Sequence, residues 1–180
     1  LRYNPAFQFA LKALRDGWLG EIFELHGSMN KKNPDSVRKS LAQYRGGSMF
    51  ELGCHLIDQV VLMLGKPDKV TAYVRSTQPQ KDSLNDNQLA VFEYPKAVAM
   101  VHSAVVEIEG ERRRQFALSG SEGTIDIRPL EPPKVLLVLS GPRGEFKKGS
   151  QDVALPPIAG RYDGDFADLA KIIRGEKAPD

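Results

Sequence analysis

Between residues 70 and 140 the sequence carries six β-patterned stretches in succession, with no helical period between them. Residues 21–30 alternate apolar and polar side chains and predict one earlier strand. Because the helical patterns are grouped before and after this run, we expect an α+β domain with a largely antiparallel sheet. The predicted strands of the run are residues 70–77, 88–94, 98–108, 115–119, 124–128 and 135–140, with a tight turn at 94–97.

Several of these strands are apolar on both faces. Residues 135–139 have no polar face at all. In the predicted strand 98–108, Val98 and Met100 lie on one face, and Ala99, Val101 and Val105 lie on the other. The predicted helices are too few to cover two faces of a sheet, so they should lie on one face and leave the other open. A second copy of the chain is the simplest cover, and the sequence therefore predicts a homo-oligomer that uses the open sheet face.

Three segments have helical periodicity. The first begins at Asn4-Pro5 and ends at Gly17, and the last covers residues 165–174. The middle one covers residues 48–64 and is predicted to be mostly buried, with Ser48 and Glu51 in the pattern of a capping box. Residues 31–45, just before it, are polar and predict a long loop or a loop with one helical turn.

The middle helix carries a narrow polar stripe. Glu51, His55 and Asp58 are spaced i, i+4, i+7, so they lie on one side of an otherwise apolar helix. One interpretation gives them separate structural roles: a cap, a hydrogen-bonded histidine and a surface acid. The other makes His55 a general base whose imidazolium form the two carboxylates stabilise.

Other chemistry-bearing residues have simpler interpretations. Cys54 points about 100° away from His55 on the helix, so the two do not form a nucleophile–base pair, and a buried, inert thiol is expected. His26 and His102 are expected on the sheet. The histidines have no zinc-type spacing, so no metal site is predicted.

Bulk composition narrows the class of protein. The chain has 180 residues and a net charge of +2, which indicates one domain and gives no reason to expect nucleic acid or membrane binding. The short basic runs, Lys31-Lys32, Arg112-Arg113-Arg114 and Lys147-Lys148, are interpreted as solvated. A single cysteine and the lack of an apolar run of ~20 residues favour a cytoplasmic protein.

The stretch Gly46-Gly47-Ser48-Met49-Phe50-Glu51-Leu52-Gly53-Cys54-His55-Leu56-Ile57-Asp58, followed by Gly65-Lys66-Pro67-Asp68-Lys69-Val70, resembles the C-terminal domain of the glucose–fructose oxidoreductase/inositol dehydrogenase (Gfo/Idh/MocA) family. Residues 2–6, 17–22, 120–125 and 162–175 resemble other parts of that domain. The resemblance implies the C-terminal fold of dihydrodipicolinate reductase and glucose–fructose oxidoreductase, with an open-faced antiparallel sheet. The family's acid at position 51 is usually aspartate, and here it is Glu51.

The same resemblance implies a function. It is that of an NAD- or NADP-dependent oxidoreductase that moves hydride between nicotinamide and a secondary alcohol of a sugar, polyol or related small molecule. His55 would take the hydroxyl proton, Glu51 would orient His55 or hold substrate, and Asp58, Tyr44 and Arg45 would contact substrate. The dinucleotide would be bound mainly by a preceding Rossmann domain, since no Gly-x-Gly-x-x-Gly follows a strand here. Residues 1–180 are thus expected to be the substrate-binding and oligomerisation domain of a longer protein, inactive alone.

A different class of function stays open. The chain could be a non-catalytic sheet domain for oligomerisation or ligand sensing, in which Glu51 only caps its helix. A catalytic lysine in the preceding domain would favour the enzyme, and its loss would favour the alternative.

Overall fold

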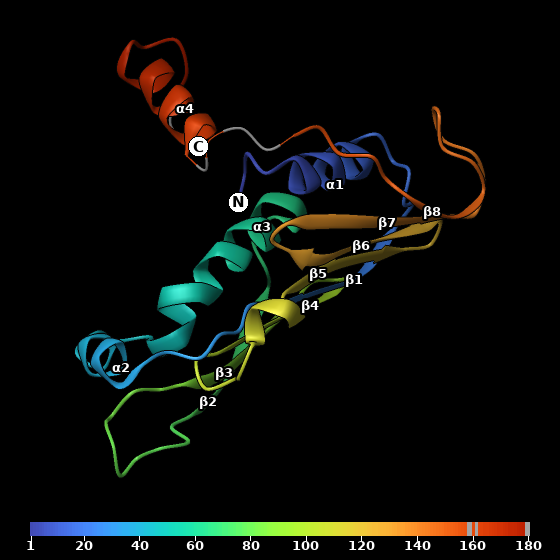
Figure 1. Cartoon of the computed structure of the whole chain (residues 1–180). Coiled ribbons are helices and arrows are strands. Elements are labelled where there is room, and N and C mark those ends of the chain that lie inside the picture. The colour runs from blue at the N-terminus through green and yellow to red at the C-terminus, as the bar shows by residue number, and fades with distance from the viewer. Residues whose placement is uncertain (158–159, 161, 179–180) are drawn as a thin grey trace.

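The computed structural model describes residues 1–157, 160 and 162–178, and an eight-stranded sheet is its main element (Figure 1). The strand order is β2-β3-β4-β1-β5-β6-β7-β8. The strands are β1 (Ile22–Ser28), β2 (Lys69–Arg75), β3 (Asn87–Glu93), β4 (Val98–Ala104), β5 (Gln115–Gly120), β6 (Gly123–Leu130), β7 (Pro133–Leu139) and β8 (Gly149–Asp152).

The three predicted helices lie before and after the run of strands from β2 to β8, as expected, and one short 3₁₀-helix between β4 and β5 was not predicted. The fold is therefore α+β, as expected. The helices are α1 (Pro5–Arg15), α2 (Asp35–Leu41), the π-helix η1 (Met49–Gly53), α3 (Cys54–Leu64), the 3₁₀-helix η2 (Gly110–Arg113) and α4 (Asp163–Ile173).

Strand β1 lies in the middle of the sheet and joins its two halves. It pairs parallel with β4 and antiparallel with β5, and every other pairing of named strands is antiparallel. The largely antiparallel sheet is therefore confirmed, with one parallel pair. The tight turn at 94–97 is also confirmed, since Tyr94 N donates to Ala97 O at 3.0 Å.

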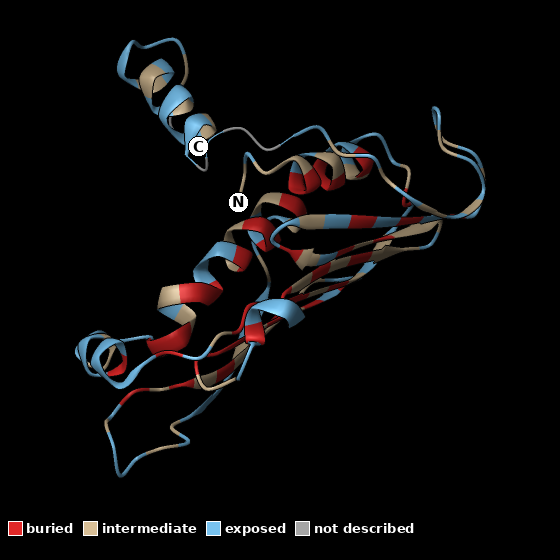
Figure 2. Cartoon of the chain, in the orientation of Figure 1, coloured by how far each residue is buried: buried red, intermediate tan, exposed pale blue. Residues whose placement is uncertain are grey.

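Helices α1 and α3 cover one face of the sheet (Figure 1), and the described residues leave most of the opposite face uncovered, apart from the end where Arg113 of η2 lies beside Ser28. Buried residues occur along the strands and in α1 and α3 (Figure 2). The buried apolar residues of the strands include Leu25, Ala99, Phe116, Ile125 and Leu137. The open face exposes apolar side chains, including Val98, Leu136 and Val138. The expectation of helices on one face of an open sheet is confirmed.

The first and last helices of the described chain differ in burial: α1 has buried residues and α4 has none. Asn4 caps α1 as predicted, because its Oδ1 accepts a hydrogen bond from Ala6 N at 2.9 Å. Helix α4 begins two residues before the predicted start and buries none of its side chains, leaving Phe166, Leu169 and Ile173 exposed. No helix within the described residues is both long and apolar enough to cross a bilayer.

Candidate active site

The predicted polar stripe lies on the helical segment formed by η1 and α3. Leu52, Leu56, Val60 and Met63 are buried against the sheet, so the predicted core side of this helix is confirmed. The prediction that the helix is mostly buried is wrong, because Phe50 is 59% and Val61 46% exposed. The sheet covers only one arc of the helix, and the apolar residues beside the stripe face outward.

The helix begins with a π-turn, and the predicted capping box is wrong. Ser48 has helical dihedrals and no capping bond, and its Oγ lies 2.9 Å from Ser103 O and 3.1 Å from Gln88 Oε1. Gln88 on β3 accepts the hydrogen bond from Met49 N at 2.8 Å, which satisfies a donor of the helix start. Glu51 is therefore free of any capping role, and it lies in a π-helical turn of the kind often found at functional sites.

Glu51 is held by two side chains from the segment that follows β1. Lys31 Nζ forms an ion pair with Glu51 Oε1, and Asn33 Nδ2 donates to Glu51 Oε2 at 3.2 Å. Backbone bonds from Lys31 N to Ala104 O and from Asn33 N to Val105 O, each of 3.0 Å, fix this segment to the end of β4. The interpretation of Lys31 as a solvated charge is therefore wrong.

Asp58 is held in the same way from the start of the chain. Arg2 donates from Nη2 to Asp58 Oδ1 at 2.7 Å and from Nε to Asp58 Oδ2 at 2.9 Å. Gln59 Nε2 adds a bond of 2.9 Å to Asp58 Oδ2. Two-point Arg–carboxylate contacts fix the carboxylate plane as well as its charge.

His55 lies between these two carboxylates along the helix and is exposed. A neutral imidazole in this position can accept a proton from a ligand that reaches the outer side of the helix. The expected buried thiol next to it is wrong, since Cys54 is also exposed. Desolvation of its sulfur nevertheless raises the pKa of Cys54, so the thiol is protonated and weakly nucleophilic at neutral pH.

Tyr44 and Arg45 lie on the surface just before the helix. The Tyr44 ring stacks on Phe50 with centroids 6.1 Å apart, and both side chains are exposed. Arg45 is exposed as well. The structure thus brings Tyr44 beside the residue that precedes Glu51, while Arg45 extends from the same loop.

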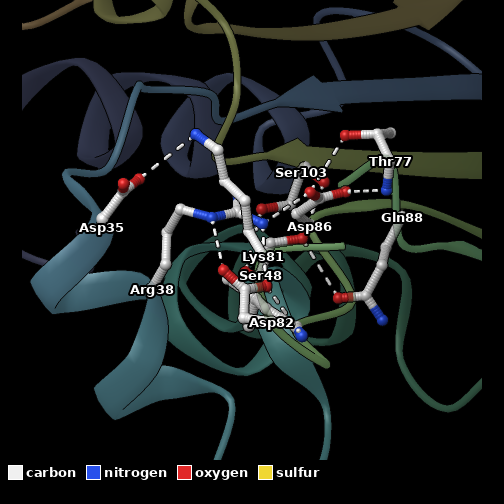
Figure 3. Close-up of polar contacts among 10 residues, drawn as sticks. Asp35, Arg38, Ser48, Thr77, Lys81, Asp82, Asp86, Gln88 and Ser103 are labelled. Atoms are coloured by element: carbon white, nitrogen blue, oxygen red, sulfur yellow. Dashed lines mark hydrogen bonds and ion pairs between the residues drawn. The ribbon is translucent and has the colours of Figure 1, made fainter. Parts of the chain in front are cut away.

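This loop is anchored by a buried arginine on α2, so the loop does contain a helix, and at seven residues this helix is longer than the single turn expected. Arg38 is 2% exposed and donates to Asp82 at 2.8 and 2.9 Å and to Asp86 at 2.9 Å (Figure 3). Asp86 also accepts hydrogen bonds from Thr77 N and Oγ1. The ion triad ties α2, and the loop after it, to the connection between β2 and β3.

Sequence reasoning missed Arg2, Lys31 and Asn33. Each contacts a stripe carboxylate from 18 to 56 positions away, and such long-range pairs have no sequence period. Lys31 and Lys32 are neighbours in the sequence, but the Lys31 side chain reaches Glu51 whereas Lys32 is exposed. Arg114, which was also interpreted as solvated, is buried and donates to Asn30 O at 3.1 Å, so that interpretation is wrong too.

Known proteins resemble this chain in sequence and in fold. The family model for the GFO/IDH/MocA C-terminal domain matches residues 7–126. An uncharacterized oxidoreductase of Escherichia coli, YhhX, is 30% identical over 125 residues, which are 68% of this chain and 34% of YhhX. The scyllo-inositol 2-dehydrogenase (NADP(+)) IolW of Bacillus subtilis is 24% identical over 96% of this chain and 53% of its own length.

Solved structures share the fold. A levoglucosan dehydrogenase in complex with NADH and levoglucosan superposes with a TM-score of 0.78 at 16% identity, over 97% of this chain and 55% of that one. An aldose–aldose oxidoreductase from Caulobacter crescentus, complexed with glycerol, also gives 0.78 at 20% identity, over 99% and 53%.

The sheet and the helix that packs on it fit the class of domain that the matched family model describes. The chain belongs to the GFO/IDH/MocA C-terminal domain family. It spans about half the length, or less, of the relatives that it matches.

Proposed function

We propose that this chain forms the substrate side of an NAD(P)-dependent oxidoreductase that interconverts a secondary alcohol and a ketone on a sugar, polyol or related compound. The observation that carries the proposal is the exposed His55 between two carboxylates, Glu51 and Asp58, each held by a cation from another element. The names of IolW and of levoglucosan dehydrogenase support the same reaction and substrate class.

His55 is the proposed proton acceptor. It takes the proton of the substrate hydroxyl while the C–H electron pair leaves as hydride, so the carbon becomes a carbonyl. A nicotinamide dinucleotide would supply the hydride acceptor when bound. Glu51 and Asp58 stabilise the imidazolium and accept hydrogen bonds from substrate hydroxyls through the oxygen lone pairs that their cations leave open.

The dinucleotide would be held mainly outside residues 1–180. The chain contains no Gly-x-Gly-x-x-Gly between a strand and a helix, so it lacks the phosphate-binding turn of such sites. The outward-facing Phe50, Tyr44 and Val61 give a ligand or a neighbouring domain apolar surface beside His55. The isolated 180 residues should therefore show no micromolar affinity for NAD or NADP in calorimetry.

Substitution of His55 tests the enzymatic role in the full-length protein. His55→Ala should lower kcat by roughly 10²–10⁴ with an unchanged melting temperature, because the side chain is exposed. Cys54→Ser, at the adjacent exposed position, is the matched control and should keep kcat. An unchanged kcat in His55→Ala would remove His55 from the mechanism and favour the non-catalytic role.

The same proposal includes self-association through the open sheet face. Val98, Leu136 and Val138 are 44%, 40% and 38% exposed there, on a face that neither α1 nor α3 covers (Figure 1). Burying such a face against a second copy removes apolar area from water at about 25 cal/mol per Å². Light scattering should give a dimer or a larger assembly, and a monomer across the micromolar range would contradict this.

A further inference from the structure

The surface segment of residues 39–46 is bounded by a buried residue at each end. Arg38, just before it, is 2% exposed, and Ser48, just after it, is 0% exposed. Between these ends the chain is on the surface, and Tyr44 and Arg45 are both exposed. Side chains that bind ligands are often presented in this way, on an exposed loop that a rigid scaffold holds in place.

The first end of the segment is held by a buried ion triad (Figure 3). Arg38 donates to Asp82 at 2.8 and 2.9 Å and to Asp86 at 2.9 Å, and the three side chains are 2%, 6% and 0% exposed. Asp86 is itself fixed, because its carboxylate accepts from Thr77 N and Oγ1 and its carbonyl accepts from Val105 N at 2.9 Å. The guanidinium of Arg38 is therefore tied to a fixed point on the sheet.

The second end of the segment is held by the residue next to Asp86. Ser48 N donates to Asn85 O at 2.9 Å. Gly47 lies so close to the same group that a Cβ on it would be 2.2 Å from Asn85 O. The consecutive residues Asn85 and Asp86 thus hold the two ends of segment 39–46, which makes it a closed loop on a single base.

Within the loop, a third contact reaches the helix that carries the polar stripe. The Tyr44 ring stacks on Phe50 with centroids 6.1 Å apart, and Phe50 N donates to Gly46 O at 3.2 Å. Phe50 directly precedes Glu51, the first residue of the stripe. The position of Tyr44 relative to the stripe therefore depends on where the two ends of the loop are held.

Stability alone is a weak reason for a buried ion triad. Buried ion pairs can often be replaced by apolar side chains at no cost, because desolvation offsets the attraction between the charges. In addition, Nη1 of Arg38 is buried and has no hydrogen-bond partner among the described residues. The planar fork of an arginine contributes direction as well as attraction, since it fits carboxylates in few orientations.

We propose that Arg38 is a positioning residue for substrate binding, which acts by fixing the loop of residues 39–46. The inference rests on the function proposed above and adds a residue that sets substrate affinity without touching the substrate. Tyr44 and Arg45 are proposed to bind substrate and take no part in proton transfer, so a loosened loop weakens binding of the ground state and the transition state alike. KM then rises, while kcat and its pH dependence, which His55 governs, stay unchanged.

Conservative exchange of two neighbouring basic residues tests this in the full-length protein. Arg38→Lys keeps the charge and loses the fork, so it should raise KM about fivefold or more and leave kcat and its pH profile as in wild type. Lys39→Arg, the reverse exchange at the exposed next position, should change neither constant. Asp82→Asn, in which Arg38 keeps its bond to Asp86, should raise KM by a smaller factor and provides the test if melting by circular dichroism shows that Arg38→Lys is unfolded.

A double-mutant cycle separates positioning from a general loss of structure. In the Tyr44→Ala/Arg45→Ala background, Arg38→Lys should change KM less than about twofold, because the contacts that it positions are already lost. A full KM effect in that background would show that Arg38 acts elsewhere and would overturn the proposal. An unchanged KM in folded Arg38→Lys and folded Asp82→Asn would overturn it as well.

Hydrogen exchange keeps the fate of this proposal separate from that of the proposed function. The amides of Ala42, Gln43 and Tyr44 donate to carbonyls of α2 at 2.9, 3.3 and 3.0 Å. They should exchange about tenfold faster or more in Arg38→Lys, whether or not substrate is turned over. Faster exchange with an unchanged KM would overturn the role in substrate binding and leave the function of His55 standing. An unchanged kcat in His55→Ala would instead overturn the proposed function, and this inference with it.

Discussion

Arg2 and Asp58, 56 positions apart, meet through a two-point contact in which Nη2 and Nε of the guanidinium each donate to a different carboxylate oxygen, at 2.7 and 2.9 Å. The contact connects the start of the chain to the middle of α3. Both side chains are about one-third exposed, so the pair contributes little to stability, about 0–1 kcal/mol. Its main effect is to orient the Asp58 carboxylate.

Arg2→Ala should therefore affect turnover more than folding. Without its partner Asp58 samples several rotamers, and we expect kcat/KM to fall about tenfold or more while the melting temperature changes little. Arg2→Lys keeps the positive charge but loses the two-point contact, so its kcat/KM should lie between those of wild type and Arg2→Ala. Arg15→Ala, an exposed arginine at the end of α1, is the control, and equal kcat/KM in Arg2→Ala and Arg15→Ala would contradict the orienting role.

Lys31 and Lys32 provide a second, internally matched comparison. Lys31 pairs with Glu51, whereas Lys32 is exposed and forms no side-chain hydrogen bond or ion pair within the described residues. Lys31→Met should lower kcat/KM about tenfold or more because the Glu51 carboxylate loses the cation that holds it. Lys32→Met should leave kcat/KM within twofold of wild type. Similar kinetics for the two variants would show that the ion pair has no role in the reaction.

The Arg38–Asp82 pair predicts how stability depends on pH. The hydrogen bonds from Arg38 lower the pKa of Asp82 below its ordinary value of about 3.9. A carboxylate whose pKa is lower in the folded state contributes stability that is fully present above the unfolded pKa and is lost as pH falls through the folded one. Urea unfolding of wild type and Asp82→Asn should therefore differ most above about pH 5 and converge as pH falls toward 2–3. A difference independent of pH would contradict this linkage.

Gly47 and Gly65 lie at the two ends of the helix formed by η1 and α3. Alanine at each position tests whether the backbone of Gly47 lies too close to Asn85 to leave room for a side chain. Both have positive φ, 53° and 78°, so alanine is strained at either. A Cβ on Gly47 would also lie 2.2 Å from Asn85 O, whereas one on Gly65 would meet nothing within 4 Å. Gly65→Ala should cost about 1–3 kcal/mol of unfolding free energy, because its ψ of −162° belongs to a region that essentially only glycine adopts. Gly47→Ala should cost more, because the close contact with Asn85 O adds to the backbone strain, and urea unfolding measures both losses. Equal losses would show that the backbone near Asn85 yields.

The spacing of apolar residues and the presence of turn and capping residues predicted most of the helices and strands, because these signals are local in the sequence. The alternation of residues 21–30, the Asn4 cap and the buried Leu52–Leu56–Val60–Met63 side all reappear in the structure. Strand β8 was missed, since Gly149-Ser150-Gln151-Asp152 is a short polar edge with no apolar face to bury. The strand predicted to reach residue 108 ends at Ala104, because the chain bends at Val105.

The candidate site was half predictable. The helical period placed Glu51, His55 and Asp58 on one stripe, but the residues that hold the two carboxylates come from distant elements. Their choice depends on strand order, and the parallel pairing of β1 with β4 is what sets Lys31 and Asn33 beside Glu51. The capping box failed for a related reason: Gln88 on β3 satisfies the helix start through a tertiary contact.

The central position of β1 has a consequence for folding. Strands β2–β4 form one meander and strands β5–β8 another, and each meander pairs strands that are neighbours in the sequence. Such local pairings are expected to form early. Strand β1 must instead be inserted between the two meanders, and its pairing with β4 joins residues more than 70 positions apart. Until β1 is inserted, the two meanders share no edge and Lys31 has no fixed position. The step that completes the sheet therefore also completes the site. In hydrogen exchange, the amides of β1 and of residues 30–33 should lose their protection together, as one cooperative unit.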